Sequence, residues 1–151
     1  MTRRTQPNVL LVEDNPGDVR LLREVLTGDV EGGGSRATLH VVPDGEQALT
    51  YLAQEDQRPD LILLDLNLPG MSGKEVLDQI KADSDLLTIP VLILTSSSAP
   101  SDISDCYERH ANCYLVKPKG YADLVELGRA LEEFWLSRVE PCPPNPNRRA
   151  R

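Results

Sequence analysis

Four short apolar runs in this chain each end in polar residues that are able to do chemistry. In chain order these residues are Glu13 with Asp14, Asp65, Thr95 and Lys117. A short apolar run bounded by turn residues is typical of a buried strand in a parallel sheet. Ligands and reactive groups in such sheets lie at the carboxyl ends of the strands. We therefore expect these side chains to meet at one edge of a sheet.

Carboxylates that share one sheet edge repel each other unless a cation lies between them. A few oxygen ligands with room for water suit Mg²⁺. A hydroxyl and an ammonium group at the same edge suit phosphoryl chemistry, because Lys117 would neutralise the phosphoryl oxygens and Thr95 would donate a hydrogen bond to one of them. In that chemistry Asp65 is the expected nucleophile and forms an aspartyl phosphate.

Each of these residues, taken alone, has an ordinary structural explanation. Acids, hydroxyls and lysines are common at strand ends, and Asp65 by itself could cap a helix or occupy a turn. Their occurrence at the ends of four different predicted strands makes coincidence a weak explanation. His40 and His110 fit structural or surface roles better than a ligand role.

The strands that position these residues alternate with helices. The expected strands are residues 8–13, 37–42, 60–65, 91–95 and 113–116.

Recognisable caps start the first three helices. Asn15 precedes a proline at the first helical position, whereas Asp44 and Ser72 each have Gln or Glu three residues later, the pattern of a capping box. The third helix is expected to reach Ala82, and the last two are expected at residues 102–110 and 121–137.

Five β/α units with right-handed crossovers predict an α/β fold, a parallel sheet with helices on both faces. Doubly wound, flavodoxin-like sheets have the strand order 2-1-3-4-5. In that order the first and third strands are neighbours, and Glu13, Asp14 and Asp65 converge at one mouth.

Composition limits the class of protein. The chain has 151 residues and a formal charge of −8 with no basic stripe, which argues for one domain and against a nucleic-acid partner. We expect a domain at residues 1–138 and a proline-rich, disordered tail at residues 139–151. The three cysteines have no metal-like spacing, which indicates reduced thiols. No apolar run is long enough for a signal peptide or a membrane span. We therefore expect a cytoplasmic location.

Two glycine-containing segments do not qualify as phosphate-binding loops. Gly32-Gly33-Gly34 lacks the phosphate-loop signature and is expected in a flexible loop. Gly73-Lys74 lacks the preceding glycine of a Walker A motif and is followed by Glu75 instead of Ser or Thr.

The ordered set of motifs resembles the response-regulator receiver domain of two-component signalling. The resemblance covers residues 8–136 and rests on the acidic pair, on Asp65 within LILLDLNLPGMSG, on Thr95-Ser96 and on Lys117-Pro118. It implies that Asp65 accepts a phosphoryl group from a sensor histidine kinase. It also implies that Glu13, Asp14 and Asp65 bind Mg²⁺ together with the backbone carbonyl of Asn67.

The same resemblance implies a switch and a special peptide bond. Phosphorylation is expected to draw Thr95 inward, and Tyr114 is expected to rotate into the vacated space. The peptide bond between Lys117 and Pro118 is expected to be cis, which proline makes energetically accessible.

Three features resemble the stand-alone receivers that serve bacterial and cyanobacterial phytochrome kinases: the segment from Glu132 to Leu136, the segment Asn112-Cys113-Tyr114, and the long loop after the first helix. Such receivers tend to form homodimers through the last strand and helix. Phe134, Trp135 and Leu136 are adjacent and cannot all face one core, so at least one should be exposed. We therefore expect an interface that includes these three residues and Tyr114.

Three classes of function compete. The first is a phosphoacceptor switch that is not an enzyme and signals by conformational change and protein contact, or else acts as a phosphate sink or relay intermediate. The second is a phosphohydrolase, which would need an acid two residues after Asp65, where this chain has Asn67. The third is a degenerate receiver that binds partners without phosphorylation, against which the intact acids argue.

Overall fold

The computed structural model describes residues 6–28, 37–54, 56, 58–144 and 146. Its centre is one parallel sheet with the strand order β2-β1-β3-β4-β5, which confirms the predicted α/β fold and order. The strands are β1 (Asn8–Val12), β2 (Thr38–Val42), β3 (Leu61–Leu64), β4 (Val91–Thr95) and β5 (Cys113–Val116). The helices are α1 (Pro16–Thr27), α2 (Gly45–Leu52), α3 (Gly73–Ala82), α4 (Pro100–Glu108), α5 (Tyr121–Leu131) and the π-helical segment η1 (Glu132–Leu136).

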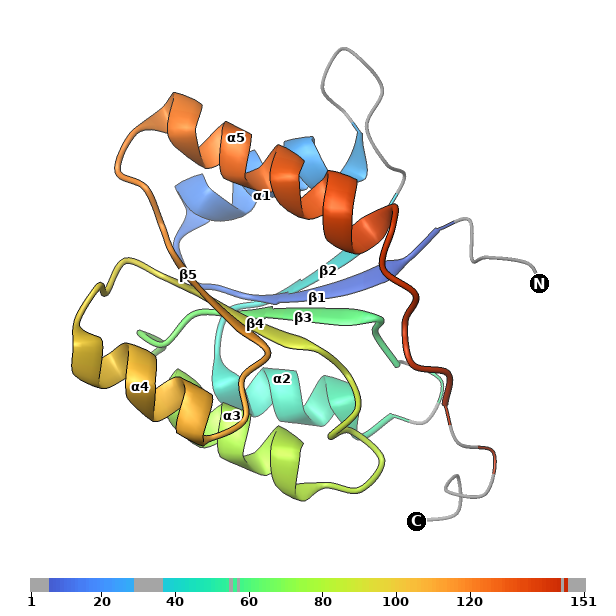
Figure 1. The fold of residues 1–151 in the computed structure, drawn as a ribbon. Helices are drawn as coiled ribbons and strands as arrows, with labels where there is room; N and C mark the ends of the chain where they lie inside the picture. Colours follow the sequence, from blue (N-terminus) through green and yellow to red (C-terminus); the bar gives the residue numbers. More distant parts are fainter. Residues whose placement is uncertain (1–5, 29–36, 55, 57, 145, 147–151) are drawn as a thin grey trace.

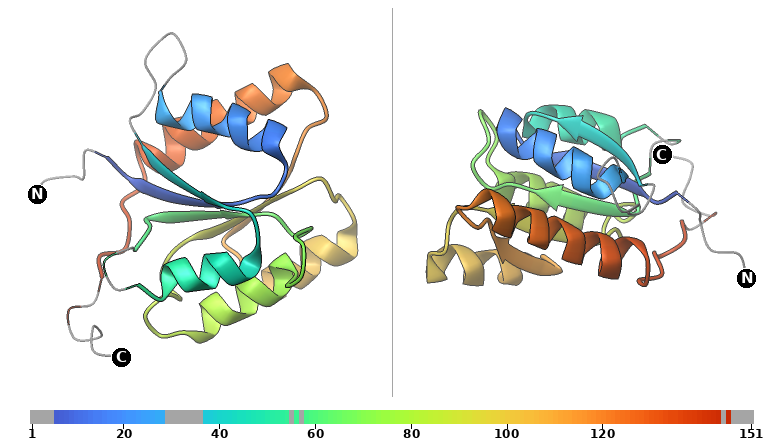
Figure 2. Two further views of the ribbon diagram at one scale, coloured as in Figure 1. Left: turned by 180° about the vertical axis from the view of Figure 1, so that it is seen from behind. Right: turned by 90° about the horizontal axis from the view of Figure 1, so that it is seen from above.

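The helices cover both faces of the sheet. Helices α1 and α5 lie on one face, and α2, α3 and α4 lie on the other (Figures 1 and 2). Successive strand residues face opposite layers, so that Leu10 and Ile62 belong to the core under α2 and α3, whereas Leu11 and Leu63 belong to the core under α1 and α5. The inner strands β1, β3 and β4 are buried on both faces, and this is why they are nearly continuous apolar runs.

The register of the strands brings their carboxyl ends level. Val12 pairs with Leu64 across β1 and β3, and Thr95 pairs with Val116 across β4 and β5. Glu13 and Asp65 therefore follow the ends of two neighbouring strands at the same level, and Lys117 follows the end of β5 beside Thr95 of β4.

Side-chain caps fix where the helices begin. The Asn15 side chain accepts a hydrogen bond from the Asp18 backbone, the Asp44 side chain accepts one from the Gln47 backbone, and Ser72 forms a full capping box with Glu75. These caps confirm the three predicted helix starts.

Several predicted boundaries are corrected. The first three strands are shorter than expected, and α4 spans residues 100–108 rather than 102–110, since Pro100 occupies its first turn. The last predicted helix is α-helical only to Leu131 and then becomes π-helical. The Gly32-Gly33-Gly34 segment lies outside the described residues.

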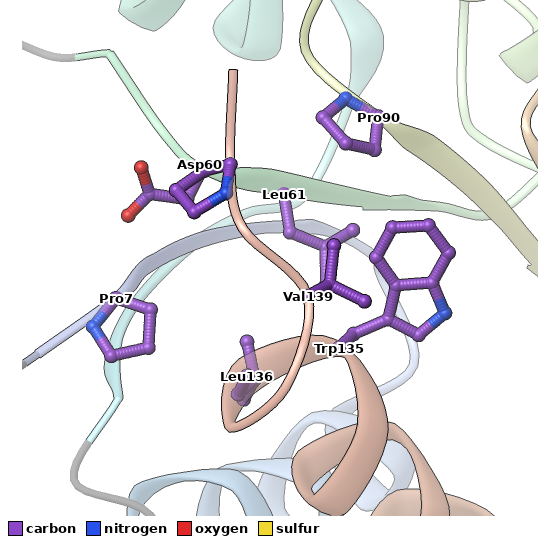
Figure 3. A pocket seen from close by; sticks show the side chains of 8 residues that line it. Pro7, Asp60, Leu61, Pro90, Trp135, Leu136 and Val139 are labelled. Atoms are coloured by element: carbon purple, nitrogen blue, oxygen red, sulfur yellow. The ribbon is translucent and has the colours of Figure 1, made fainter. Parts of the chain in front are cut away.

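The start of the expected tail packs against the domain. Val139 and Pro141 line a small cavity with Leu61 and Trp135 at the amino ends of the strands (Figure 3). The domain boundary at residue 138 stays a prediction. Residues 145 and 147–151 of the tail lie outside the described part of the chain. No helix in the described ranges has the length and apolar character needed to cross a bilayer.

Candidate functional site

The carboxyl edge of the sheet carries the predicted acidic cluster. Oxygen atoms of Glu13, Asp14 and Asp65 all lie within 4.8 Å of one another. Glu13 and Asp65 are buried, whereas Asp14 is exposed and keeps the cluster open to water. Three carboxylates with access to solvent match the ligand preference of Mg²⁺, which retains several waters.

Lys117 reaches into this cluster from the end of β5. Its Nζ atom lies 2.6 Å from Oε1 of Glu13, 2.9 Å from Oδ2 of Asp18 and 3.2 Å from Oδ2 of Asp65. The structure thus brings Lys117 to the predicted nucleophile. Asp18 is not among the residues expected from the sequence; the signal that could have identified it is its place as an acid in the first turn of the helix that follows the acidic pair.

Burial and charge perturb this cluster in opposite ways. Burial is the largest cause that raises the pKa of Glu13 to about 7, with a contribution from the charge of Asp65 and an opposing one from Lys117. Burial tends to lower the pKa of Lys117, but hydrogen bonds to Glu13 and Asp18 outweigh it, so the pKa of Lys117 lies above its ordinary value. Lys117 is therefore a stable cation beside the acceptor.

Thr95 supplies an unused hydrogen-bonding group. Its side chain is fully buried, and Oγ1 has no hydrogen-bond partner in the described part of the chain. Such a group is costly to leave unpaired, and it fits a position that awaits an incoming acceptor. The Thr95 carbonyl accepts a 2.7 Å hydrogen bond from the Lys117 backbone, which ties the two strand ends together.

Tyr114 lies beside the loop that follows Thr95. Its hydroxyl donates a 2.9 Å hydrogen bond to the Ser97 carbonyl, and the ring is half-buried. The aromatic residue predicted for the switch is thus joined directly to the segment that would move.

The loop after Asp65 folds closely around it. The Asn67 backbone donates a 3.2 Å hydrogen bond to Oδ1 of Asp65. A Cβ atom at Gly73 would lie 2.2 Å from the Asp65 carbonyl oxygen, so only glycine lets α3 approach this backbone. The role of the Asn67 carbonyl as a metal ligand stays a prediction.

The predicted cis peptide bond at Pro118 is wrong. No peptide bond among the described residues is cis, and the bond from Lys117 to Pro118 is one of them. The trans form is favoured even before proline, and with it Lys117 still reaches both Glu13 and Asp65.

The predicted interface residues divide into two groups. Phe134 is 55% exposed and meets the half-buried Trp135 edge to face, with ring centroids 5.9 Å apart. Leu136 is only 5% exposed and belongs to the core under α1 and α5, so it is a core residue rather than a surface one. The adjacent residues separate because one helical stripe cannot hold all three.

Comparison with known proteins places the chain in a family. Residues 9–129 match the family described as "Response regulator receiver domain". The chain is 43% identical over 137 residues to the response regulator Rcp1 of Synechocystis sp., and the match covers 87% of this chain and 90% of Rcp1.

Two solved structures share the fold. The Mn²⁺-bound form of Rcp1 superposes with a TM-score of 0.83 at 42% identity, covering 91% of this chain and 99% of that one. The phosphorylated cyanobacterial phytochrome response regulator RcpA superposes with a TM-score of 0.85 at 40% identity, with the same coverage. With its acidic cluster, Lys117 and Thr95 at one sheet edge, the chain belongs to the response-regulator receiver family, whose members bind Mg²⁺ at this site.

Proposed function

We propose that Asp65 accepts a phosphoryl group from a sensor histidine kinase of the phytochrome type. The observation that carries this proposal is the position of the Asp65 carboxylate, which lies in the acidic cluster and 3.2 Å from the ammonium of Lys117. A nucleophile, a metal site and a fixed cation therefore meet at one point. This is the arrangement that phosphoryl transfer requires.

Each residue has a defined part in the transfer. A carboxylate oxygen of Asp65 attacks the phosphorus atom of the kinase phosphohistidine, and the P–N bond breaks as the histidine leaves and takes up a proton. Lys117 neutralises a phosphoryl oxygen, and the Thr95 hydroxyl, which has no other partner among the described residues, donates a hydrogen bond to another. A bound Mg²⁺ supplies further charge neutralisation at the phosphoryl oxygens.

The kinase class is inferred from the relatives. The chain resembles a phosphorylated cyanobacterial phytochrome response regulator over 91% of its length. It is also 33% identical to the response regulator RPA3017, which acts in red light signalling of R. palustris. These likenesses support a kinase that responds to light.

The signal is proposed to leave the domain by conformational change and protein contact. Thr95 moves toward the phosphoryl group, and Tyr114 follows because its hydroxyl is bonded to the adjoining loop. Phe134 and Trp135 offer an apolar surface for a second copy of the chain. A phosphate sink or relay intermediate is the alternative if no contact depends on phosphorylation.

Two experiments test this function. The first measures intact mass after incubation with Mg²⁺ and acetyl phosphate, beside the Asp65→Asn variant. We expect a gain of one phosphoryl group that is lost in the variant and with a chelator. No gain, or steady release of free phosphate without an adduct, would contradict the acceptor proposal.

The second experiment measures transfer from an autophosphorylated phytochrome histidine kinase. A histidine kinase without a phytochrome sensor, used at the same concentration, is the control. We expect faster transfer from the phytochrome kinase. Equal rates would reject the partner class while leaving the phosphoacceptor function intact.

A further inference from the structure

Three polar residues from separate segments are connected through one carboxylate. Lys74 lies in the first turn of α3, Asp102 in the first turn of α4, and Ser97 in the loop between β4 and α4. The Lys74 ammonium lies 2.8 Å from Oδ1 of Asp102. The Ser97 hydroxyl donates a 2.6 Å hydrogen bond to Oδ2 of the same carboxylate. Both oxygens of Asp102 are thus engaged, one by a helix and one by the loop.

Ser97 also connects this chain of contacts to the proposed switch. Its carbonyl accepts the hydrogen bond from the Tyr114 hydroxyl at 2.9 Å, and it lies two residues after Thr95. Ser97 therefore makes two connections. Its side chain contacts Asp102 of α4, which pairs with Lys74 of α3, and its backbone carbonyl contacts Tyr114. The loop cannot move toward the acceptor without disturbing at least one of these bonds.

Lys74 is itself held firmly. A second carboxylate, Asp105 of α4, lies 2.9 Å from its ammonium. Hydrogen bonds from Lys74 lower the pKa of both Asp102 and Asp105, so both are charged at neutral pH. A hydrogen bond from Ser97 to a charged acceptor is stronger than one to a neutral group.

We propose that Lys74 and Asp102 are positioning residues that hold the Ser97 loop in its resting arrangement, and that phosphorylation breaks the bond between Ser97 and Asp102. This inference rests on the proposed phosphoacceptor function. When the Thr95 hydroxyl turns to a phosphoryl oxygen, the loop follows and Ser97 leaves Asp102. The contact exists only in the resting state, so it opposes phosphorylation by the free energy it contributes to that state.

The test compares two alanine variants, of which one removes the hydrogen bond from Ser97 and the other does not. Asp102→Ala removes both the Lys74 pair and the Ser97 bond. Asp105→Ala removes a Lys74 pair of nearly equal length, together with an ion pair to Arg109, and leaves the bond between Ser97 and Asp102 in place. The readout is the initial rate at which each protein gains a phosphoryl group from acetyl phosphate with Mg²⁺, measured by intact mass.

We expect Asp102→Ala to be phosphorylated about fivefold faster than the wild type, with Asp105→Ala close to the wild type, because loss of one charge-assisted hydrogen bond weakens the resting state. A variant that was merely damaged would become slower. Hydrogen exchange of the Ser97 loop in unphosphorylated Asp102→Ala should approach that of the phosphorylated wild type.

The outcomes separate this inference from the proposed function. Equal rates for the two variants, or a slower Asp102→Ala, overturn the positioning role while phosphorylation of the wild type still stands. A wild type that takes up no phosphoryl group overturns both. If Asp102→Ala does not fold, Lys74→Met carries the test, with an expected increase of about twofold because it loosens Asp102 from one side only. An unchanged rate in Lys74→Met would then reject the proposal.

Discussion

The ammonium group of Lys117 lies 2.9 Å from the carboxylate of Asp18. Asp18 lies in the first turn of α1 and is not one of the acids that follow the strands. Asp18 therefore shares Lys117 with Glu13 and Asp65, and it would compete with the proposed phosphoryl group for this ammonium. The contact joins α1 to the residue that follows β5.

Replacing Asp18 with Asn should speed phosphorylation of Asp65 by acetyl phosphate. The change frees Lys117 for the phosphoryl oxygens and removes one negative charge that repels the donor. We expect an increase of about threefold, since the carboxylate is partly exposed and such pairs contribute modestly. The control is Glu24→Gln, the same loss of charge farther along α1 in a pair with Arg20. A slower Asp18→Asn protein would show that Asp18 holds Lys117 in place instead of competing for it.

Asp14 should be required for tight metal binding, because it is the exposed member of the cluster of carboxylates. We expect Asp14→Asn to weaken Mg²⁺ binding at least about tenfold, because removal of a residue that only hydrogen-bonds to a metal ligand already lowers metal affinity by about that factor. Calorimetric titration of chelator-treated protein with MgCl₂ measures this. Glu133→Gln, an exposed acid in η1, controls for net charge. Unchanged affinity in Asp14→Asn would remove that residue from the site.

Gly73 should tolerate no side chain, because a Cβ atom would lie 2.2 Å from the Asp65 carbonyl oxygen and 2.6 Å from the Leu66 Cα. We expect Gly73→Ala to lower the free energy of unfolding by about 1–3 kcal/mol, measured by urea denaturation, since backbone atoms must shift. Gly17→Ala in α1 is the matched control, as its nearest neighbour is the Asn15 side chain at 3.3 Å. Equal stability of the two variants would contradict the close approach of α3.

Truncation to alanine should affect folding stability at Leu136 and self-association at Phe134. Leu136→Ala should cost about 2–5 kcal/mol in the free energy of unfolding, because it opens a cavity in the core under α1 and α5. Phe134→Ala should leave folding nearly unchanged and weaken self-association, measured as mass in solution by light scattering, because that ring is 55% exposed. A Phe134→Ala protein with the same mass distribution as the wild type would exclude this ring from an interface.

The pairs between Lys74 and its two acids should make stability depend on acid pH. The pKa values of Asp102 and Asp105 are lowered, chiefly by hydrogen bonds from Lys74, from the ordinary 3.8. The folded chain therefore binds fewer protons than the unfolded chain in acid, and the stabilisation is present above pH 3.8 and lost as the pH falls through the folded value.

Urea denaturation of the wild type and Lys74→Met between about pH 7 and pH 3 measures this dependence. The difference in stability between the two proteins should be constant near neutrality and shrink at the acid end. Lys119→Met, an exposed lysine after β5, should show no such dependence. A difference that persists unchanged at the acid end would contradict the assignment.

Much of the site was predictable from local patterns. Apolar runs marked the strands, and the turn residues after them placed Glu13, Asp65 and Lys117 at carboxyl ends. The caps Asn15, Asp44 and Ser72 were predictable because a helix N-terminus depends on residues only three positions apart. The acidic metal site and the proposed phosphoryl acceptor could be located from these local features together with the expected strand order.

Other features required the three-dimensional structure. The contact of Lys117 with Asp18 depends on how α1 lies against the end of β5, across 99 positions of sequence. The connection from Lys74 through Asp102 to Ser97 depends on which faces of α3 and α4 meet. The inward side of Leu136 also depends on packing that no nearby residue specifies.

The sequence by itself thus determined the strands, the caps and the acids at the sheet edge, because hydrophobic periodicity and capping act over a few residues. Only the tertiary structure decided which charged side chains share a partner and which member of the Phe134–Leu136 cluster is exposed. The physical reason is that ion pairs and burial depend on distances between segments far apart in sequence, and packing of whole helices against the sheet sets those distances.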